Sequence, residues 1–401
     1  MASLVTSKFR VHNAQQFAEA FSEASNTIMY LFIGKNTTFP NDNSPPTPVN
    51  STANVEYTPW RDMYAAKRIT TADVTHAIER YNWTSGTVYD QYDDQDTDLL
   101  EDDFYVMTED YNVYKCLFNA SATASTTKPT GVSTSPFTTA DGYIWKYMYT
   151  VTTAKALKFL TNDYIPVQIL ASDDGTDQWD VQTAAVDGGI HVIKVTAGGS
   201  GYATAPAVTI TGDGTGATAN STITANVVTS VTITAAGTGY TRASVTFASG
   251  AATANAIISP SGGHGSDAVE ELGGKFIMLN VRLDGNESNT FSVANEFRQV
   301  GIVRDPYLYG TTTRAVASSF RQSFKYQLSS ISGTFTVDET ITSGSNTASL
   351  IEFTTPNIFT TLPLHLPFAN TASVTGGTSG ATGTIAVITT PGLQPYTGDL
   401  L

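Results

Sequence analysis

The stretch Val195-Thr196-Ala197-Gly198-Gly199-Ser200-Gly201-Tyr202 returns 38 residues later as Ile233-Thr234-Ala235-Ala236-Gly237-Thr238-Gly239-Tyr240. Two shorter matches follow in the same order, 208–210 with 245–247 and 217–220 with 252–255. Each copy is predicted to form two or three short strands separated by Gly turns. Because a solenoid needs at least about three repeats, we expect one small β-sandwich or barrel.

The composition around this duplication divides the chain into four ranges. Residues 190–260 contain only three charged residues, Lys194, Asp213 and Arg242. A second pair of related segments, 341–348 and 374–381, lies near the end of the chain. The four expected ranges are a core in two parts (1–184 and 261–329), an inserted, duplicated Gly/Thr-rich β module (185–260) and a C-terminal β module (330–401).

The first part of the core carries most of the helical signal. Apolar residues at helical spacing after Asn13 predict one amphipathic helix that closes at Ser25-Asn26, and those after Thr71-Ala72-Asp73 predict a second, from Val74 to Tyr81. The apolar run 29–33, which ends at Gly34, has the length of a strand. The segments 104–107, 111–117 and 143–149 predict paired strands, because they alternate as strands with one buried face do. The expected class is mainly β with an α+β core: antiparallel, sandwich-like domains, a few N-terminal helices and inserted small β modules.

Charge and cysteine content exclude several classes of protein. The 401 residues carry 21 Lys and Arg against 36 Asp and Glu, a net charge of −15, and no basic patch, so nucleic acid is not an expected partner. No apolar run is long enough to span a bilayer, and the first residues lack the apolar core of a secretory signal. The single Cys116 rules out an internal disulfide framework. We expect synthesis in a reducing cytoplasm.

An acidic run places ten carboxylates within 21 residues, from Asp90 to Asp110. Within it, Asp94, Asp96 and Asp98 imitate the first ligands of a calcium loop, but Leu99 stands where that loop needs Gly and Tyr105 where it needs Glu. An irregular calcium site and a surface for a basic partner both stay open, beside a plain solvated loop.

Two further motifs are weak. The loop 261–267 holds Ser, His and Asp together, yet a catalytic triad is assembled from separate elements around a supported nucleophile. The five histidines share no metal-ligand spacing. We therefore expect no catalytic residues, no bound cofactor and no metal site.

Several segments outside the repeats carry a resemblance in a fixed order. They are the opening 5–10, the apolar run ending at Gly34, and 60–63, 81–89, 111–117, 141–147 and 297–303. Together they resemble the gene-product-eight baseplate wedge subunits of T-even-type contractile-tailed bacteriophages (myoviruses). The repeats have no counterpart in the short members of that family. The end, 396–401, resembles the start of the family's last strand region, which suggests a truncated chain or a strand supplied by a partner and an open sheet edge.

The resemblance implies a structural role without catalysis. The chain would be a homodimeric component of the virion's tail baseplate, made in the host bacterial cytoplasm, that links neighbouring wedge proteins around the hub, with no nucleic acid or membrane partner. Acidic and aromatic residues are the expected contact points, since aromatics are enriched at interface cores. The candidates are Trp60, Trp83, Tyr89, Asp94, Asp96, Asp98, Tyr143, Trp145 and Arg298.

Two alternatives belong to other classes. In the first, the repeat modules make the protein a peripheral tail adhesin or glycan-binding protein, and the isolated 185–260 module binds saccharide. In the second, the protein is a tail-associated depolymerase, which needs a pair of carboxylates in a cleft.

Overall fold

The chain is described by a computed structural model that covers residues 6–23, 27–47, 49, 51, 56–283, 296–365 and 367–401. It is mostly strand in several antiparallel sheets with few helices, so the mainly-β, sandwich-like class is confirmed. Contacts divide it into two compact units. Unit 1 comprises Met1–Ala18 and Thr75–Leu279, and unit 2 comprises Glu19–Val74 and Asn280–Leu401, so both units are discontinuous in sequence.

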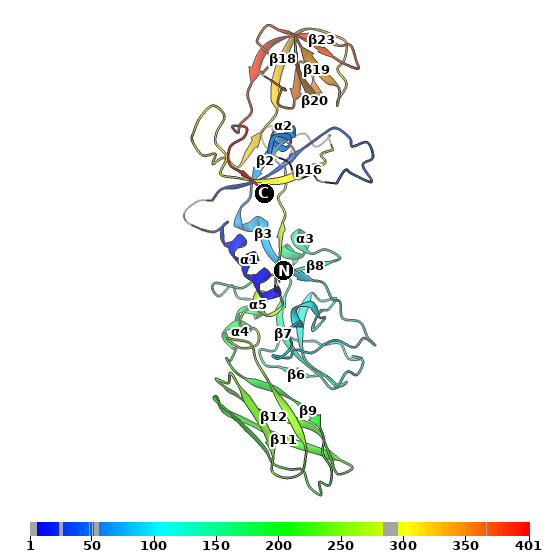
Figure 1. Cartoon of the computed structure of the whole chain (residues 1–401), viewed down its shortest axis with the longest axis vertical. Helices are drawn as coiled ribbons and strands as arrows, with labels where there is room; N and C mark the ends of the chain where they lie inside the picture. Colours follow the sequence, from blue (N-terminus) through cyan, green and yellow to red (C-terminus); the bar gives the residue numbers. More distant parts are fainter. Residues whose placement is uncertain are drawn as a thin grey trace. The chain divides into compact units, whose positions relative to one another are not determined.

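Unit 1 contains two sheets besides the inserted module (Figure 1). One has the order β4(Tyr105–Met107)-β5(Asn112–Asn119)-β7(Tyr143–Thr150)-β6(Phe137–Thr138), and the other β15(Phe276–Leu279)-β3(Val74–Glu79)-β8(Tyr164–Val167). The helical segments are α1(Ser7–Glu19), η3(Leu99–Glu101), α3(Thr153–Phe159), α4(Asp177–Thr183) and α5(Ala268–Glu271).

Strands β5 and β7 are buried on both faces, so the expectation of one exposed face is wrong. Val113 and Leu117 point into one cluster of apolar side chains, and Tyr114 and Cys116, one position away, into another. The second cluster is aromatic and includes Tyr143, Trp145 and Tyr147. Since successive residues of a strand face opposite sides, β5 separates two cores.

The two predicted helices need correction. The first, α1, begins at Ser7 and ends at Glu19, earlier than the pattern after Asn13 indicates. The second prediction is wrong: Thr71–Asp73 forms only the single turn η2, and Val74–Glu79 is strand β3. Strand β3 pairs with β8, Ile78 opposite Ile165, and this distant partner decides the local structure. Two sequence predictions, at residue 5 and at Ser25-Asn26, lie outside the described residues.

The inserted module consists of two antiparallel sheets, green to yellow-green in Figure 1. The larger has the order β11(Thr215–Thr224)-β12(Val227–Thr238)-β9(Ile190–Ala197)-β14(Thr253–Ile258), and the smaller pairs β10(Val208–Gly212) with β13(Ala243–Phe247). Equivalent strands of the two copies pair with each other, β9 with β12 and β10 with β13. The duplication is therefore a pseudo-twofold arrangement.

The repeated tyrosines show the same symmetry. Tyr202 and Tyr240 are both buried. The Tyr202 hydroxyl accepts a hydrogen bond from the Ala252 N–H at 2.9 Å, and the Tyr240 hydroxyl accepts one from the Ala217 N–H at 3.4 Å. Tyr202 thus ties the end of β9 to the start of β14, and Tyr240 ties the end of β12 to β11, which explains why Gly-Tyr closes the first matched stretch of both copies.

Unit 2 contains a five-stranded sheet and a closed barrel. The sheet has the order β17(Ser319–Arg321)-β2(Met63–Arg68)-β1(Met29–Gly34)-β16(Gln299–Arg304)-β24(Asp399–Leu400), and α2(Thr58–Asp62) precedes β2. The barrel, orange to red in Figure 1, runs β18(Phe324–Ser332)-β21(Asn357–Thr360)-β20(Asn346–Thr354)-β19(Thr340–Ser343)-β22(Ser373–Gly376)-β23(Thr382–Thr389). Strands β19 and β22, which begin the two copies of the second repeat, pair directly.

Among the described residues, no helix has both the length and the apolar character that a membrane crossing requires.

Candidate functional site

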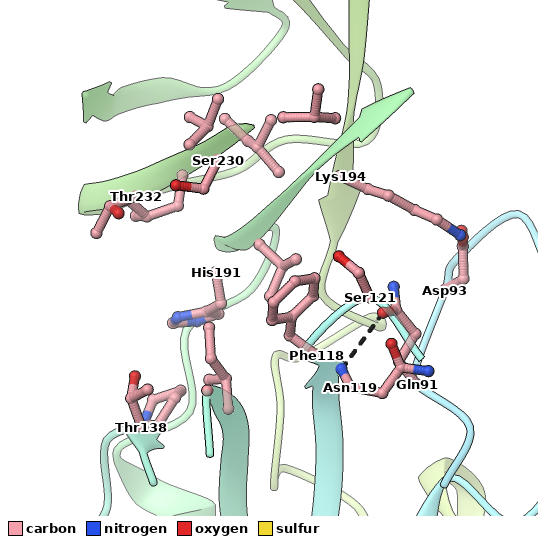
Figure 2. Close-up of a pocket in the computed structure, with 18 of the residues that line it drawn as sticks. Gln91, Asp93, Phe118, Asn119, Ser121, Thr138, His191, Lys194, Ser230 and Thr232 are labelled. Atoms are coloured by element: carbon pink, nitrogen blue, oxygen red, sulfur yellow. Dashed lines mark hydrogen bonds and ion pairs between the residues drawn. The ribbon is translucent and has the colours of Figure 1, made fainter. Parts of the chain in front are cut away.

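A groove of about 950 Å³ lies in unit 1, between the inserted module and the loops of the β4-β5-β7-β6 sheet. Strands β9 and β12 form one wall. The other wall is formed by the loop around 90–96, the end of β5 and the beginning of β7. In Figure 2, Ser230 and Thr232 of β12 lie across the groove from Thr138.

The walls expose polar and apolar surface in comparable amounts. Exposed hydroxyls come from Ser121, Thr138, Ser230 and Thr232. Phe118 is half-buried and presents part of its ring to the groove, between the polar groups (Figure 2). Apolar walls with convergent polar groups are typical of small-molecule binding sites.

A strained turn forms one rim of the groove. The residues Ala120, Ser121 and Ala122 have φ angles of +51°, +61° and +61°, in the left-handed region that L-residues seldom adopt. Asn119 holds this turn, since its Oδ1 accepts the Ala122 N–H at 3.0 Å while its Nδ2 donates to the Tyr89 carbonyl at 3.1 Å. Strained backbone of this kind concentrates at ligand sites.

The charges in the groove are predominantly negative. Asp90, Asp93 and Asp96 line it, and Lys194 of β9 supplies a positive charge. The Lys194 Nζ lies 3.8 Å from the Asp93 Oδ2, and the two side chains point toward each other in Figure 2. His191 adds no charge at neutral pH, because burial, together with the nearby Lys146, lowers its pKa to about 4.

A buried ionic cluster lies behind the groove and was not predicted from the sequence. The Lys115 Nζ of β5 donates to the Glu271 Oε2 at 2.8 Å, and both side chains are at most 2% exposed. His264 places its Nδ1 3.1 Å from the same Nζ, and the ring of His264 lies 5.5 Å from that of His191. The Tyr92 ring also faces the ammonium, at 4.0 Å. Burial lowers the pKa of both Lys115 and His264.

The loop 261–267 serves this cluster, and its Ser, His and Asp do not form a triad. The Glu271 Oε1 accepts the Gly265 N–H at 2.7 Å and the Asp267 N–H at 3.3 Å. Asp267 caps α5 by accepting the N–H groups of Val269 and Glu270, both at 2.9 Å. The carboxylates of this segment are thus engaged in holding the loop and starting the helix.

The aromatic interface candidates are mostly internal. Trp60, Tyr89, Tyr143 and Trp145 are each at most 2% exposed, so the expectation that they are exposed contact points is wrong. Tyr143 and Trp145 stack with ring centroids 5.3 Å apart in the aromatic core of unit 1, and Trp60 packs under the five-stranded sheet of unit 2. Trp83 is half-buried, and its Nε1 donates to the Ser125 Oγ at 3.1 Å. These rings are buried because each removes a large apolar surface from water.

The acidic and basic candidates are more accessible. Asp96 and Asp98 are exposed, and Asp96 accepts the Asp98 N–H at 2.9 Å in a local turn. Asp94 is half-buried and accepts the Ile258 N–H at 3.1 Å, so it joins the acidic loop to the last strand of the inserted module. Arg298, in unit 2, donates to Asp42 and to the Asn36 carbonyl. The structure therefore brings the candidates together in two groups, Tyr89, Tyr143 and Trp145 in the aromatic core and Asp94, Asp96 and Asp98 in the acidic loop.

Two signals in the sequence pointed to the residues that were missed. Lys115 interrupts an otherwise apolar strand, and Lys194 is one of three charges in the inserted module. Their partners Glu271 and Asp93 lie far away in sequence, and nothing local indicates the pairing. Within the described ranges, no group of three or more His, Cys, Asp or Glu side chains is arranged to hold a metal ion.

Comparison with known proteins gives no independent identification: no family model matches the chain, and no curated protein matches it.

Proposed function

We propose that this chain is a non-catalytic structural subunit of a bacteriophage tail baseplate wedge, which links neighbouring wedge proteins around the hub. The proposal rests on the ordered resemblance of the core segments. Asp96, Asp98 and Arg298, which solvent reaches, are the remaining candidates for contacts with those neighbours.

One structural observation supports the proposal. The segments that carry the resemblance meet as paired strands inside each unit, although they lie far apart in sequence. In unit 2, Met29–Gly34 pairs with Gln299–Arg304 in register, Met29 opposite Arg304 and Gly34 opposite Gln299. In unit 1, Asn112–Asn119 pairs with Tyr143–Thr150. The resemblance therefore follows strands that pair with each other within each unit.

Cross-linking mass spectrometry on intact purified particles that contain the chain tests this role. Lys8 and Lys194 are exposed and Lys67 is half-exposed, so an amine-reactive reagent reaches them. Lys146, at 3% exposed, serves as an internal negative control. Links from Lys8 and Lys67 to other baseplate proteins are expected.

Two results would count against the wedge role. Links that reach only fibre proteins would place the chain at the tail periphery. Links confined to its own copies would show no contact with neighbouring wedge proteins. Reaction at Lys146 would show that the particles had partly unfolded, and the links would then be measured again on fresh particles.

A further inference from the structure

We propose that the groove between the inserted module and the β5–β7 loops binds a neutral oligosaccharide. This site goes beyond the structural role and does not depend on it. The inserted module and the β4-β5-β7-β6 sheet form this site together. The adhesin alternative of the sequence analysis, in contrast, assigns saccharide binding to residues 185–260 alone.

The hydrogen-bonding groups of the groove match a polyhydroxyl ligand. Sugar hydroxyls donate and accept, and they pair best with carboxylates, amides and other hydroxyls. Carboxylates of Asp90 and Asp96 supply acceptors from the core wall, and the hydroxyls of Ser230 and Thr232 supply both functions from the module wall. All four side chains are exposed, so a ligand reaches them without rearrangement of the core.

The apolar part of the groove complements the C–H faces of a sugar ring. Phe118 and Ile144 are both half-buried and both line the groove, on paired strands β5 and β7. They are held from behind by the apolar core of unit 1. A fixed ring with polar groups around it gives orientation as well as affinity, because little side-chain freedom is lost on binding.

Charge selects the class of ligand. Three Asp side chains face Lys194 and a neutral His191, so the groove repels phosphates, sulfated sugars and uronic acids. A basic peptide is the competing ligand. The neutral sugar is favoured because Asp93 is already paired with Lys194, and because uncharged hydroxyls outnumber the remaining carboxylates on the groove walls.

The backbone at the rim is preorganised. The left-handed turn 120–122 fixes the edge of the groove, and the Asn119 side chain ties Ala122 of this turn to the Tyr89 carbonyl. Because both walls contribute, we expect the full chain to bind the oligosaccharide and the isolated module not to bind it.

The experiment uses the full chain and saturation-transfer NMR, followed by calorimetry for each ligand that binds. The probes are an array of neutral oligosaccharides of bacterial and plant origin, including maltohexaose, mannohexaose and chitohexaose. A hyaluronan hexasaccharide is the anionic comparison and hexalysine the cationic one. Saturation transfer to at least one neutral oligosaccharide, and to neither comparison ligand, is expected.

A matched pair of variants locates the site. Thr232→Trp fills the groove from β12, and an exposed strand position accepts an aromatic residue. Thr209→Trp makes the same change at an exposed Thr of β10, which does not line the groove. Thr232→Trp is expected to weaken binding at least about tenfold, which corresponds to about 1.4 kcal/mol. Thr209→Trp is expected to leave it unchanged.

Three results would overturn the proposal. The first is an array in which no neutral oligosaccharide binds. The second is binding that Thr232→Trp leaves intact, or that both variants weaken equally. The third is preferential binding of hexalysine or hyaluronan, which would assign the groove to a peptide or to an acidic polymer.

Discussion

Lys115 and Glu271 form an ion pair that water does not reach, and this burial sets the effect of a substitution. The Lys115→Met variant leaves the Glu271 carboxylate without its cation, and removing one member of a buried pair costs about 3–5 kcal/mol. We expect a loss of that order in the free energy of unfolding, measured by urea denaturation.

Two further variants test the cause. Adding Glu271→Gln to Lys115→Met removes the isolated charge and keeps an amide oxygen for the Gly265 N–H, so stability should partly return. Lys128→Met breaks the exposed pair with Glu109 and should have little effect. Equal losses in both single variants would contradict the explanation by burial.

The buried imidazoles predict a loss of stability in mild acid. Burial keeps His191 and His264 neutral in the folded chain and lowers the pKa of His191 to about 4, whereas a free histidine titrates near about 6.5. As pH falls below about 6.5, the unfolded chain gains protons that the folded chain does not bind. Stability should therefore fall from about pH 6.5 toward 4, by up to about 1.4 kcal/mol per pH unit for each imidazole.

Denaturation curves between pH 7.5 and pH 5, about the range in which histidine titrates and most carboxylates do not, check this slope. The His191→Asn variant should flatten it. His365 is exposed in unit 2, so His365→Asn should leave it as it is. A wild-type curve that is flat over this range would contradict the assignment.

Single residues were the level at which sequence reasoning failed most often. Trp and Tyr are residue types enriched at interfaces, yet Trp145 and Tyr143 stack on each other inside unit 1. The sequence pattern of β5 and β7 is compatible with one buried face or with two. Both faces are buried because a second apolar cluster covers the other side of these strands. Lys115 is buried because Glu271, 156 residues away, compensates its charge.

At the scale of the element, the glycines of the first repeat make a direct comparison possible. Gly199 and Gly237 occupy equivalent positions with φ of +63° and +66°, and a Cβ there would lie 2.7 Å from the Ala252 nitrogen and 2.5 Å from the Ala217 nitrogen. Gly201, in the same turn as Gly199, has φ of +82° and open space around it.

An alanine at any of the three positions costs about 1–3 kcal/mol of backbone strain, and the clash adds to this at Gly199 and Gly237 only. Hydrogen exchange over residues 190–258 should therefore show greater loss of protection in Gly199→Ala and Gly237→Ala than in Gly201→Ala. Similar protection in all three variants would mean that the turns relax freely.

Elements were predictable where the signal was local or repeated. The strand ending at Gly34 follows from an apolar run of strand length, and the strands of both repeats follow from their Gly turns; these regions are strands in the structure. The segment 74–81 was misread because Val74, Ala77 and Ile78 fit helical spacing as well as a strand buried on both faces. Pairing with Tyr164–Val167 selects the strand, and that partner is about 90 positions away.

At the scale of the whole molecule, the resemblance predicts a homodimer. Light scattering at micromolar concentration should give twice the chain mass of 42.6 kDa. Each copy carries a net charge of −15, so the two copies repel each other at low ionic strength, and added salt should favour the dimer. A monomeric mass at both low and high salt would contradict the prediction.

The division into two units was the least predictable feature. Sequence composition separates consecutive ranges, whereas unit 2 joins Glu19–Val74 to Asn280–Leu401. Strand pairing across some 270 residues, Tyr30 opposite Val303, makes this connection, and composition carries no information about it.

The first and last strands of the inserted module are neighbours, with Ile190 opposite Ile258. The barrel is built in the same way, because β18 and β23 pair at Lys325 and Thr389. In each case the chain enters and leaves the β module through two neighbouring strands. Such a module can be gained, lost or exchanged between related genes as a cassette, and a short linker across the Ile190–Ile258 gap is a natural place to graft a foreign domain.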